Sequence, residues 1–155
     1  TSMCSRLIEK DLVPGHDCLD IGTGSGILMI AAALLGATAL YGIDTDPCAV
    51  DIAGTNIRNN NIPDPQVSLE CRTLDRTPIR PFNIIAANII AQVIVAITGD
   101  IEKRMNNETV AILSGIIKDR LAEVLDALAT HHLRVIEQLM TDEWVALAVK
   151  KMPED

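Results

Sequence analysis

The sequence predicts an α/β domain in which helices cover both faces of a doubly wound, mostly parallel seven-stranded sheet. Short apolar runs alternate with helical patterns along the chain, which is the order that builds βαβ units. A glycine-rich loop follows the first apolar run, at the place where such sheets bind ligands. The last two apolar runs have no helix between them and are interpreted as an antiparallel pair.

Length and composition favour one compact domain over residues 1–155, with no linker, low-complexity tract or internal repeat. Hydrophobic residues make up 48% and aromatic residues 2% of the chain, so an aliphatic core is expected. The net charge is −8, and Asp75 lies within the one arginine cluster, Arg72, Arg76 and Arg80. An extensive nucleic-acid surface is therefore not expected, and a basic protein substrate suits this charge better.

The cysteines indicate a reducing compartment. Those at positions 4, 18, 48 and 71 form no C-x-x-C pair and are interpreted as buried thiols of a cytoplasmic protein. The histidines do not lie at ligand spacing from them, so no metal site is expected. Charges between residues 6 and 11 interrupt the N-terminus, so no signal peptide is expected. A start at Thr1 is consistent with the trimmed part of a longer chain.

The stretch from Asp20 to Asp44 has no charge between its ends and admits two interpretations. A membrane span needs about 20 continuous apolar residues with interfacial anchors. Here aspartates stand at both ends and five glycines interrupt the run, so a membrane span is not expected. The other interpretation is a right-handed βαβ unit. It comprises a strand over 17–21, a turn over 22–26, a helix over 25–35 ended by Gly36, and a strand over 37–43.

The remaining elements follow in order. Asp46 and Pro47 suit an N-cap and a first helical position, so a helix is expected from there to about Asn59. Further strands are predicted over 67–71, 83–88, 109–113, 133–139 and 144–150. Helices are predicted over 90–105 and 118–130. The second of these places four apolar residues on one face: Leu121, Val124, Leu125 and Leu128.

The glycine loop, D-x-G-x-G-x-G over residues 20–26, indicates a nucleotide-like ligand. Its glycines let a ligand approach the backbone, and Asp44 ends the next strand, where an acid accepts hydrogen bonds from ribose hydroxyls. Ile27 occupies the place of the third glycine of a dinucleotide fingerprint, and there is no Gly-Lys-Ser/Thr. The loop and the acid that follows it resemble the S-adenosylmethionine (SAM) loop of class I methyltransferases, and this resemblance implies SAM and not NAD or a P-loop nucleotide. The alternative is a glycine turn that serves strand–helix packing alone.

Asn88 is an amide in the otherwise apolar run IIAANIIA, at the end of the fourth predicted strand. A buried polar group is costly unless it is hydrogen-bonded. One interpretation is that Asn88 caps the following helix. The other is that its carbonyl faces the methyl group of the cofactor and accepts a hydrogen bond from a substrate amine. The two roles do not exclude each other.

The sequence resembles the PrmA family, bacterial class I methyltransferases that modify lysines of a large-subunit ribosomal protein. The matching segments cover nearly the whole chain in order: TSMCSRLIEK, LDIGTGSGILMIAAALLGA, GIDTDPCAV with NIRNN, AANIIAQVI, LSGIIKDR and EWVALAV. The resemblance implies a SAM-dependent lysine N-methyltransferase with S-adenosylhomocysteine as product. It also implies a seven-stranded sheet whose last strand is antiparallel.

The resemblance implies a role for individual residues as well. Asn88 is the expected catalytic residue, which aligns the amine together with the backbone near Ile89. Ser114 and Gly115 match an SGI segment after the fifth strand, for which a strand-end turn is the simpler interpretation. The expected cofactor-binding residues are Thr1, Asp20, Gly22, Thr23, Gly24, Gly26, Asp44, Thr45 and Asn88.

Two departures from the family matter. Its N-terminal domain for substrate recognition has no counterpart in these residues, so either a fragment of a longer chain or another substrate is expected. Asn106-Asn107 replaces a Pro-Gly-Gly type turn. The AANII segment lacks the Asn-Pro-Pro-aromatic form that methylates nucleic-acid bases, so no aromatic stands there to stack a flipped base. The alternatives that stay open are a methyltransferase for another protein or a small molecule, and a SAM-binding module without catalysis. A dehydrogenase fragment is disfavoured by Ile27.

Overall fold

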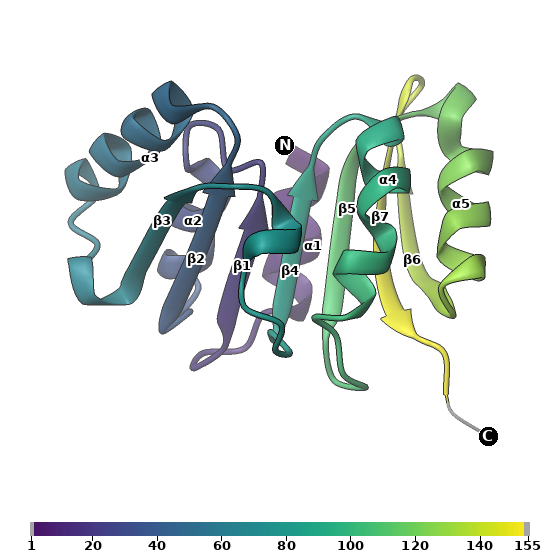
Figure 1. Ribbon diagram of the computed structural model, residues 1–155, viewed down its shortest axis with the longest axis horizontal. Coiled ribbons are helices and arrows are strands. Elements are labelled where there is room, and N and C mark those ends of the chain that lie inside the picture. Colours follow the sequence, from purple (N-terminus) through teal and green to yellow (C-terminus); the bar gives the residue numbers. More distant parts are fainter. Residues whose placement is uncertain (1, 154–155) are drawn as a thin grey trace.

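The computed structural model describes residues 2–153, which build one seven-stranded sheet with strand order β3-β2-β1-β4-β5-β7-β6 (Figure 1). The strands are β1 (Asp17–Ile21), β2 (Ala39–Asp44), β3 (Val67–Cys71), β4 (Ile84–Asn88), β5 (Val110–Ile117), β6 (Leu133–Met140) and β7 (Trp144–Lys151). The helices are α1 (Ser2–Asp11), α2 (Ile27–Leu34), α3 (Pro47–Asn59), α4 (Ala91–Glu102) and α5 (Leu121–Thr130).

Strand directions confirm the predicted fold class. The pairs β1–β2, β1–β4, β2–β3 and β4–β5 are parallel, whereas β7 pairs antiparallel with both β5 and β6. Because β1 lies between β2 and β4, the direction in which the chain winds reverses next to β1. Open α/β sheets bind ligands at such a switch point, outside the carboxyl ends of the strands.

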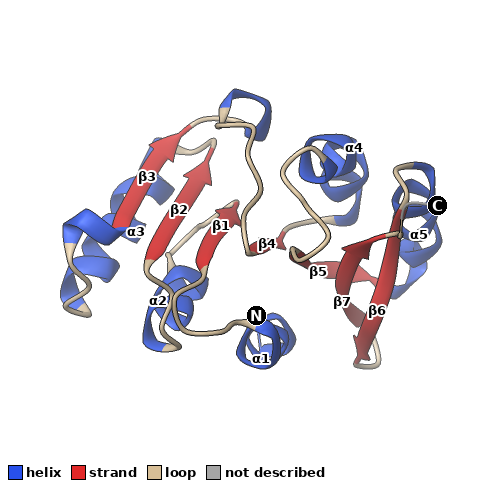
Figure 2. Cartoon of the chain, turned by 90° about the horizontal axis from the view of Figure 1, so that it is seen from below, coloured by secondary structure: helices blue, strands red, loops and turns tan. Residues whose placement is uncertain are grey.

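The sheet lies between helices (Figure 2), and an apolar layer fills the space between the sheet and the helices on each face. Helices α1, α2 and α3 contribute to the layer on one face, and α4 and α5 to the layer on the other. Successive residues of β4 serve both layers, since Ile84 and Ala86 face the first and Ile85 and Ala87 the second. A strand covered on both faces has no polar side to show, which explains why this run lacks alternation.

The helix boundaries follow from local signals. Asp46 caps α3 because its Oδ1 accepts a hydrogen bond from the backbone N–H of Cys48 at 2.9 Å, and Pro47 is the first helical residue. Gly36 follows α2 with a φ of +104°, the left-handed conformation that favours glycine after a helix. Both predicted signals are confirmed. Within residues 2–153, no helix is long and apolar enough to cross a membrane.

Several predicted boundaries are wrong. The helix predicted over 25–35 spans 27–34, and the helix predicted over 90–105 spans 91–102. The fifth strand does not end at residue 113 but runs to Ile117, so Ser114 and Gly115 lie inside a strand and not in a turn after it. Residues 118–130 are not one helix, because 118–120 form a 3₁₀ turn before α5 begins. Of the predicted apolar face of α5, Val124 and Leu128 are buried, whereas Leu125 is 37% exposed.

The prediction of four buried thiols is only half correct. Cys4 and Cys18 are buried, and burial raises the pKa of Cys4 to about 12, helped by the charge of Asp20. Cys48 and Cys71 are exposed. Cys48 lies in the first turn of α3 and Cys71 is the last residue of the edge strand β3, and neither position is covered by another element.

Candidate functional site

Two adjoining cavities lie at the carboxyl ends of the parallel strands. The first, of about 430 Å³, extends from Gly22 and Asp44 to Leu74, with residues of α4 along one wall. The second, of about 460 Å³, lies around Asn88. The two cavities share Ile89 and Ile90, which follow β4 directly. The ligand edge predicted from the sheet therefore contains two compartments separated by isoleucine side chains.

The glycine loop is held in a conformation that only glycine adopts without strain. Gly22, Gly24 and Gly26 have φ values of +72°, +53° and +83°. The backbone N–H groups of Gly22 and Thr23 both donate to the carbonyl of Ile43 at 2.9 Å, which ties the loop to the end of β2. A Cβ on Gly26 would lie 3.2 Å from Ala53 Cα, so this glycine serves the close packing of α2 against α3.

Asp44 presents an oriented carboxylate to the first cavity. Its Oδ2 accepts from the backbone N–H of Gly24 and its Oδ1 from that of Asp46, both at 3.0 Å. An ionised carboxylate offers about four lone-pair sites, so two remain for a ligand. Such an acceptor, beside a loop without side chains at Gly22, suits a pair of vicinal hydroxyls.

Asp20 lies beneath the same loop, buried, with Oδ2 accepting from Thr23 Oγ1 at 2.8 Å. Its Oδ1 has no hydrogen-bond partner among residues 2–153. Burial raises the pKa of Asp20 to about 7; the bond from Thr23 opposes this rise and the charge of Asp44 adds to it. A carboxyl group kept in this position is poised to ionise when a cation comes near it.

A β-bulge in β5 sets the position of Asn88. It pairs with Ser114, and the N–H of Ile89 donates to the carbonyl of Ser114 at 3.1 Å. The β5–β7 register shifts at this point, a β-bulge that Gly115 permits with a φ of +80°. A Cβ on Gly115 would lie 2.8 Å from the carbonyl oxygen of Ile89 and 3.1 Å from Asn88 Oδ1. Only glycine therefore lets β5 approach Asn88 this closely.

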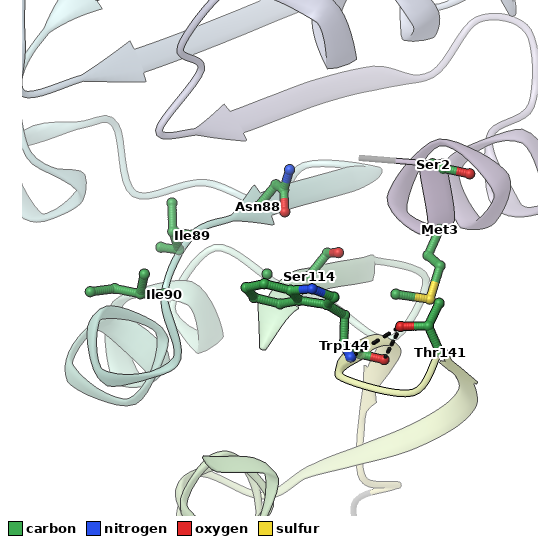
Figure 3. A pocket seen from close by; sticks show the side chains of 9 residues that line it. Ser2, Met3, Asn88, Ile89, Ile90, Ser114, Thr141 and Trp144 are labelled. Carbon is green, nitrogen blue, oxygen red and sulfur yellow. Dashed lines mark hydrogen bonds between the residues drawn. The ribbon is translucent and has the colours of Figure 1, made fainter. Parts of the chain in front are cut away.

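The capping interpretation of Asn88 does not hold, because the N-cap position of α4 is Ile90. Asn88 instead lines the second cavity (Figure 3). Next to it, Ile89 fills the space beside Gly22, where a Cβ would lie 2.7 Å from Ile89 Cγ2. The side chain of Ile89 is thus the partition between the two compartments.

The second cavity is assembled from segments far apart in the sequence. Its wall comes from α1, the end of β4, the β5 bulge and the hairpin between β6 and β7. Figure 3 shows the indole of Trp144 reaching below Asn88, with Ile90 to one side and Met3 and Thr141 to the other. None of the described residues that line it carries a charge: Ser2, Met3, Asn88, Ile89, Ile90, Ser114, Gly115, Thr141 and Trp144.

The structure separates the predicted site residues into three groups. Gly22, Asp44 and Thr45 line the first cavity and Asn88 lines the second. Asp20, Thr23, Gly24 and Gly26 line neither cavity and instead support the loop. Thr1 lies outside the described residues.

Sequence reasoning missed two parts of the site. It did not assign the far wall of the first cavity, residues 72–74 with Val93 and Ile97. It also did not assign Trp144, although a single tryptophan at the start of a buried strand, directly after two acidic residues, is a recognisable signal. Residues 72–74 follow β3, Val93 and Ile97 belong to α4, and Trp144 begins β7, so the sheet topology is what brings both parts to the site.

Comparisons of the sequence with known proteins agree on one family. A sequence model described as "Ribosomal protein L11 methyltransferase (PrmA)" matches residues 1–152. The ribosomal protein L11 methyltransferase of Desulforapulum autotrophicum is 44% identical over 150 residues, which are 97% of this chain and 50% of that protein. The chain spans about half the length of the relatives it matches.

Solved structures support the same fold. The ribosomal protein L11 methylase of Lactobacillus delbrueckii subsp. bulgaricus superposes with a TM-score of 0.92 at 28% identity, over 99% of this chain and 79% of that one. Magnesium protoporphyrin IX methyltransferase of Synechocystis, solved with bound SAM, gives a TM-score of 0.80 at 18% identity, over 97% and 76%. The second likeness shows the fold alone.

Proposed function

We propose, on the premise that the chain belongs to the ribosomal protein L11 methyltransferase (PrmA) family, that it transfers methyl groups from SAM to lysine amines of ribosomal protein L11. The observation that carries the proposal is the pair of cavities, one beside Asp44 and one beside Asn88, which meet at Ile89. One compartment suits a nucleoside and the other an acceptor side chain. The proposal includes the cytoplasm as the location of the reaction, because the acceptor is a ribosomal protein.

The first cavity fits the nucleoside part of SAM. The Asp44 carboxylate, already oriented by two backbone N–H groups, accepts from the ribose hydroxyls. The apolar wall that includes Leu74, Val93 and Ile97 suits the base, and the methionine chain would run along Gly22 and Ile89, which line the same cavity. When bound, SAM supplies an electrophilic methyl group on a sulfonium.

The second cavity prepares the amine. A lysine ammonium that enters it leaves water for a lining whose described residues are uncharged, and desolvation lowers the pKa of the amine. The neutral amine then donates a hydrogen bond to the side-chain oxygen of Asn88, which orients the nitrogen lone pair. No acid or base is found among the described residues of this lining. Positioning and desolvation are therefore the contributions of the chain.

Charge on the hairpin favours a basic acceptor. Asp142 and Glu143 are exposed at the tip of the hairpin between β6 and β7, directly before Trp144, and the whole chain has a net charge of −8. A field of this sign attracts cationic partners and raises the rate at which they meet the protein. A protein rich in lysine fits this surface.

The test is transfer of a labelled methyl group. The chain is incubated with radiolabelled SAM and purified ribosomal protein L11, and the methylated residues are identified by mass spectrometry. Label on lysines of L11 is the expected result. SAM binding without label on L11 would reject L11 as the acceptor. Label on another protein or on a small molecule would identify that molecule as the acceptor instead. No binding of SAM by the folded chain would reject the proposal as a whole.

A further inference from the structure

We infer that Trp144 is the specificity-determining residue for the acceptor, and that its indole ring recognises the positively charged nitrogen of methylated lysine. The inference rests on the proposed function, because it assigns the contents of the second cavity. It adds a residue and an interaction that the resemblance to the family does not imply. It predicts a preference for cationic over neutral side chains of the same shape.

The backbone of Trp144 is held in place by a tight hairpin. Its N–H donates to Thr141 Oγ1 at 3.1 Å, and the N–H of Thr141 donates to its carbonyl at 2.9 Å. On the other side, Trp144 pairs with Ile117 at the end of β5, where the N–H of Lys118 donates to the carbonyl of Glu143 at 2.9 Å. The backbone that carries the indole ring is therefore held by hydrogen bonds within the hairpin and by pairing with the end of β5.

The ring lies between the second cavity and the surface. Trp144 lines that cavity together with Asn88, and it also lines an outer groove of about 220 Å³ with Ile117 and Arg120. It is 43% exposed, so its side chain is accessible. A lysine side chain that comes from the outer groove must pass the indole before its nitrogen reaches Asn88.

Methyl transfer from the sulfonium to a neutral amine leaves a cation in the second cavity. The nitrogen lone pair forms the new N–C bond, the S–C electron pair stays on sulfur, and the positive charge moves from sulfur to nitrogen. Among the lining residues that the structure describes, none is a carboxylate that could balance that charge. The face of an indole attracts cations, most strongly when they are desolvated. Trp144 is the one aromatic residue among the described residues of this lining.

The first experiment uses the natural fluorescence of the chain, since Trp144 is its only tryptophan. The chain is saturated with S-adenosylhomocysteine and titrated with a short peptide that carries trimethyl-lysine. A second peptide carries the neutral isostere, in which carbon replaces the nitrogen. We expect a change in emission and binding of the cationic peptide about tenfold tighter than binding of the isostere. Equal affinities, or no change in emission, would overturn the inference.

Variants distinguish the interaction of a cation with the aromatic face of Trp144 from the effect of the volume of its side chain. Calorimetry with Trp144→Leu should show about a tenfold loss for the trimethyl-lysine peptide and little change for the isostere, whereas Trp144→Phe should keep part of the preference. Met140→Ala is the matched control, because Met140 is 47% exposed on the same hairpin but does not line the cavity. Equal losses for both peptides in Trp144→Leu would mean that Trp144 is only an apolar wall.

The outcomes also distinguish this inference from the proposed function. Methyl transfer to lysine by the natural chain, with the same kcat/KM in Trp144→Leu, would keep the function and reject the inference. Absence of transfer, with the preference for the cationic peptide present and lost in Trp144→Leu, would keep the recognition site and reject the reaction. Melting temperature and affinity for S-adenosylhomocysteine should be equal in all variants, which shows that the fold and the first cavity are intact.

Discussion

At the scale of single residues, the site contains two carboxylates and one amide. They come from neighbouring strands, but their surroundings differ. Asp44 is oriented by backbone N–H groups at the edge of a cavity, and Asp20 is buried beneath the loop. Asn88 lines the second cavity. The sequence predicts these three residues because each stands at or near the end of an apolar strand. It does not predict Trp144, which reaches the cavity through strand pairing that no local pattern encodes.

Asp44→Ala is expected to weaken SAM binding by at least about tenfold, because hydrogen bonds from the ribose to a charged acceptor are lost. The measurement is calorimetric titration, with the melting temperature as a check on folding. Asp51→Ala is the matched control, an exposed acid on α3 away from both cavities. An unchanged affinity in Asp44→Ala would remove Asp44 from the ribose role.

Asn88→Ala is expected to lower the rate of methyl transfer at saturating SAM by about a hundredfold while the affinity for SAM changes little, since the role proposed for the amide is to align the amine. Single-turnover transfer and SAM titration give the two quantities. Asn59→Ala, an exposed amide at the end of α3, serves as the control. Equal losses in rate and affinity would assign Asn88 to the structure of the cofactor cavity.

Asp20 gives stability a predictable dependence on pH. Its pKa is about 7 in the folded chain and near the ordinary 3.8 when unfolded, so between these values the folded state binds the extra proton. Its contribution to the free energy of unfolding therefore falls as pH rises from about 4 to about 7, and then stays level. Asp20→Asn removes this pH-dependent decrease in the free energy of unfolding, and its amide oxygen can still accept the hydrogen bond from Thr23.

The stability of Asp20→Asn relative to the natural chain should therefore rise by a few kcal/mol, in order of magnitude about 1.4 kcal/mol for each unit of pKa shift, between pH 4 and pH 7. Urea unfolding of both chains at several pH values measures the difference. A difference that does not depend on pH would show that Asp20 titrates alike in the folded and unfolded states.

At the scale of elements, the β5 bulge is the feature that sequence reasoning did not predict. The apolar run stops at Leu113 and is followed by Ser114 and Gly115, which resemble a turn. The strand continues because β7 pairs again with Ile116 beyond the bulge. Pairing between distant strands decides this, and a local pattern contains no information about it. By contrast, β1, β3 and α3 match their predicted ranges because their boundaries are set by residues within them.

Gly115→Ala tests the bulge as an element. It combines the strain of a φ of +80° with a Cβ only 2.8 Å from a backbone oxygen. We expect a loss of more than about 2 kcal/mol in the free energy of unfolding, since a left-handed residue with a Cβ already costs about 1–2 kcal/mol. Gly15→Ala is the matched control, because Gly15 has a φ of +97° with nothing within 4 Å of its Cβ position.

Urea unfolding compares the two glycine variants, and methyl transfer is measured in parallel. Gly115→Ala should also reduce transfer, because its Cβ would press on Asn88 and Ile89. If Gly115→Ala costs no more stability than Gly15→Ala, the close approach of β5 to Asn88 is not required. The bulge would then be a detail of strand pairing with no part in the site.

At the scale of the whole molecule, sheet topology explains why the residues meet. The order β3-β2-β1-β4-β5-β7-β6 places the carboxyl ends of β1, β2 and β4 side by side, and the antiparallel β7 begins at that same edge of the sheet. The loop after β1, the acid of β2 and the amide of β4 therefore face one space, and β7 starts with the indole. The fold class and strand directions follow from the alternation of elements, whereas the division of the site into two cavities depends on packing around Ile89.

The central claim is that one ligand connects the two cavities, with its ribose at Asp44 and its sulfur beside Ile89 and Asn88. A crystal structure of the chain with S-adenosylhomocysteine tests it most directly. The account predicts ribose hydroxyls within hydrogen-bond distance of the Asp44 carboxylate and the sulfur facing the cavity of Asn88 and Trp144. Ribose bound away from Asp44, or sulfur directed away from Asn88, would contradict it.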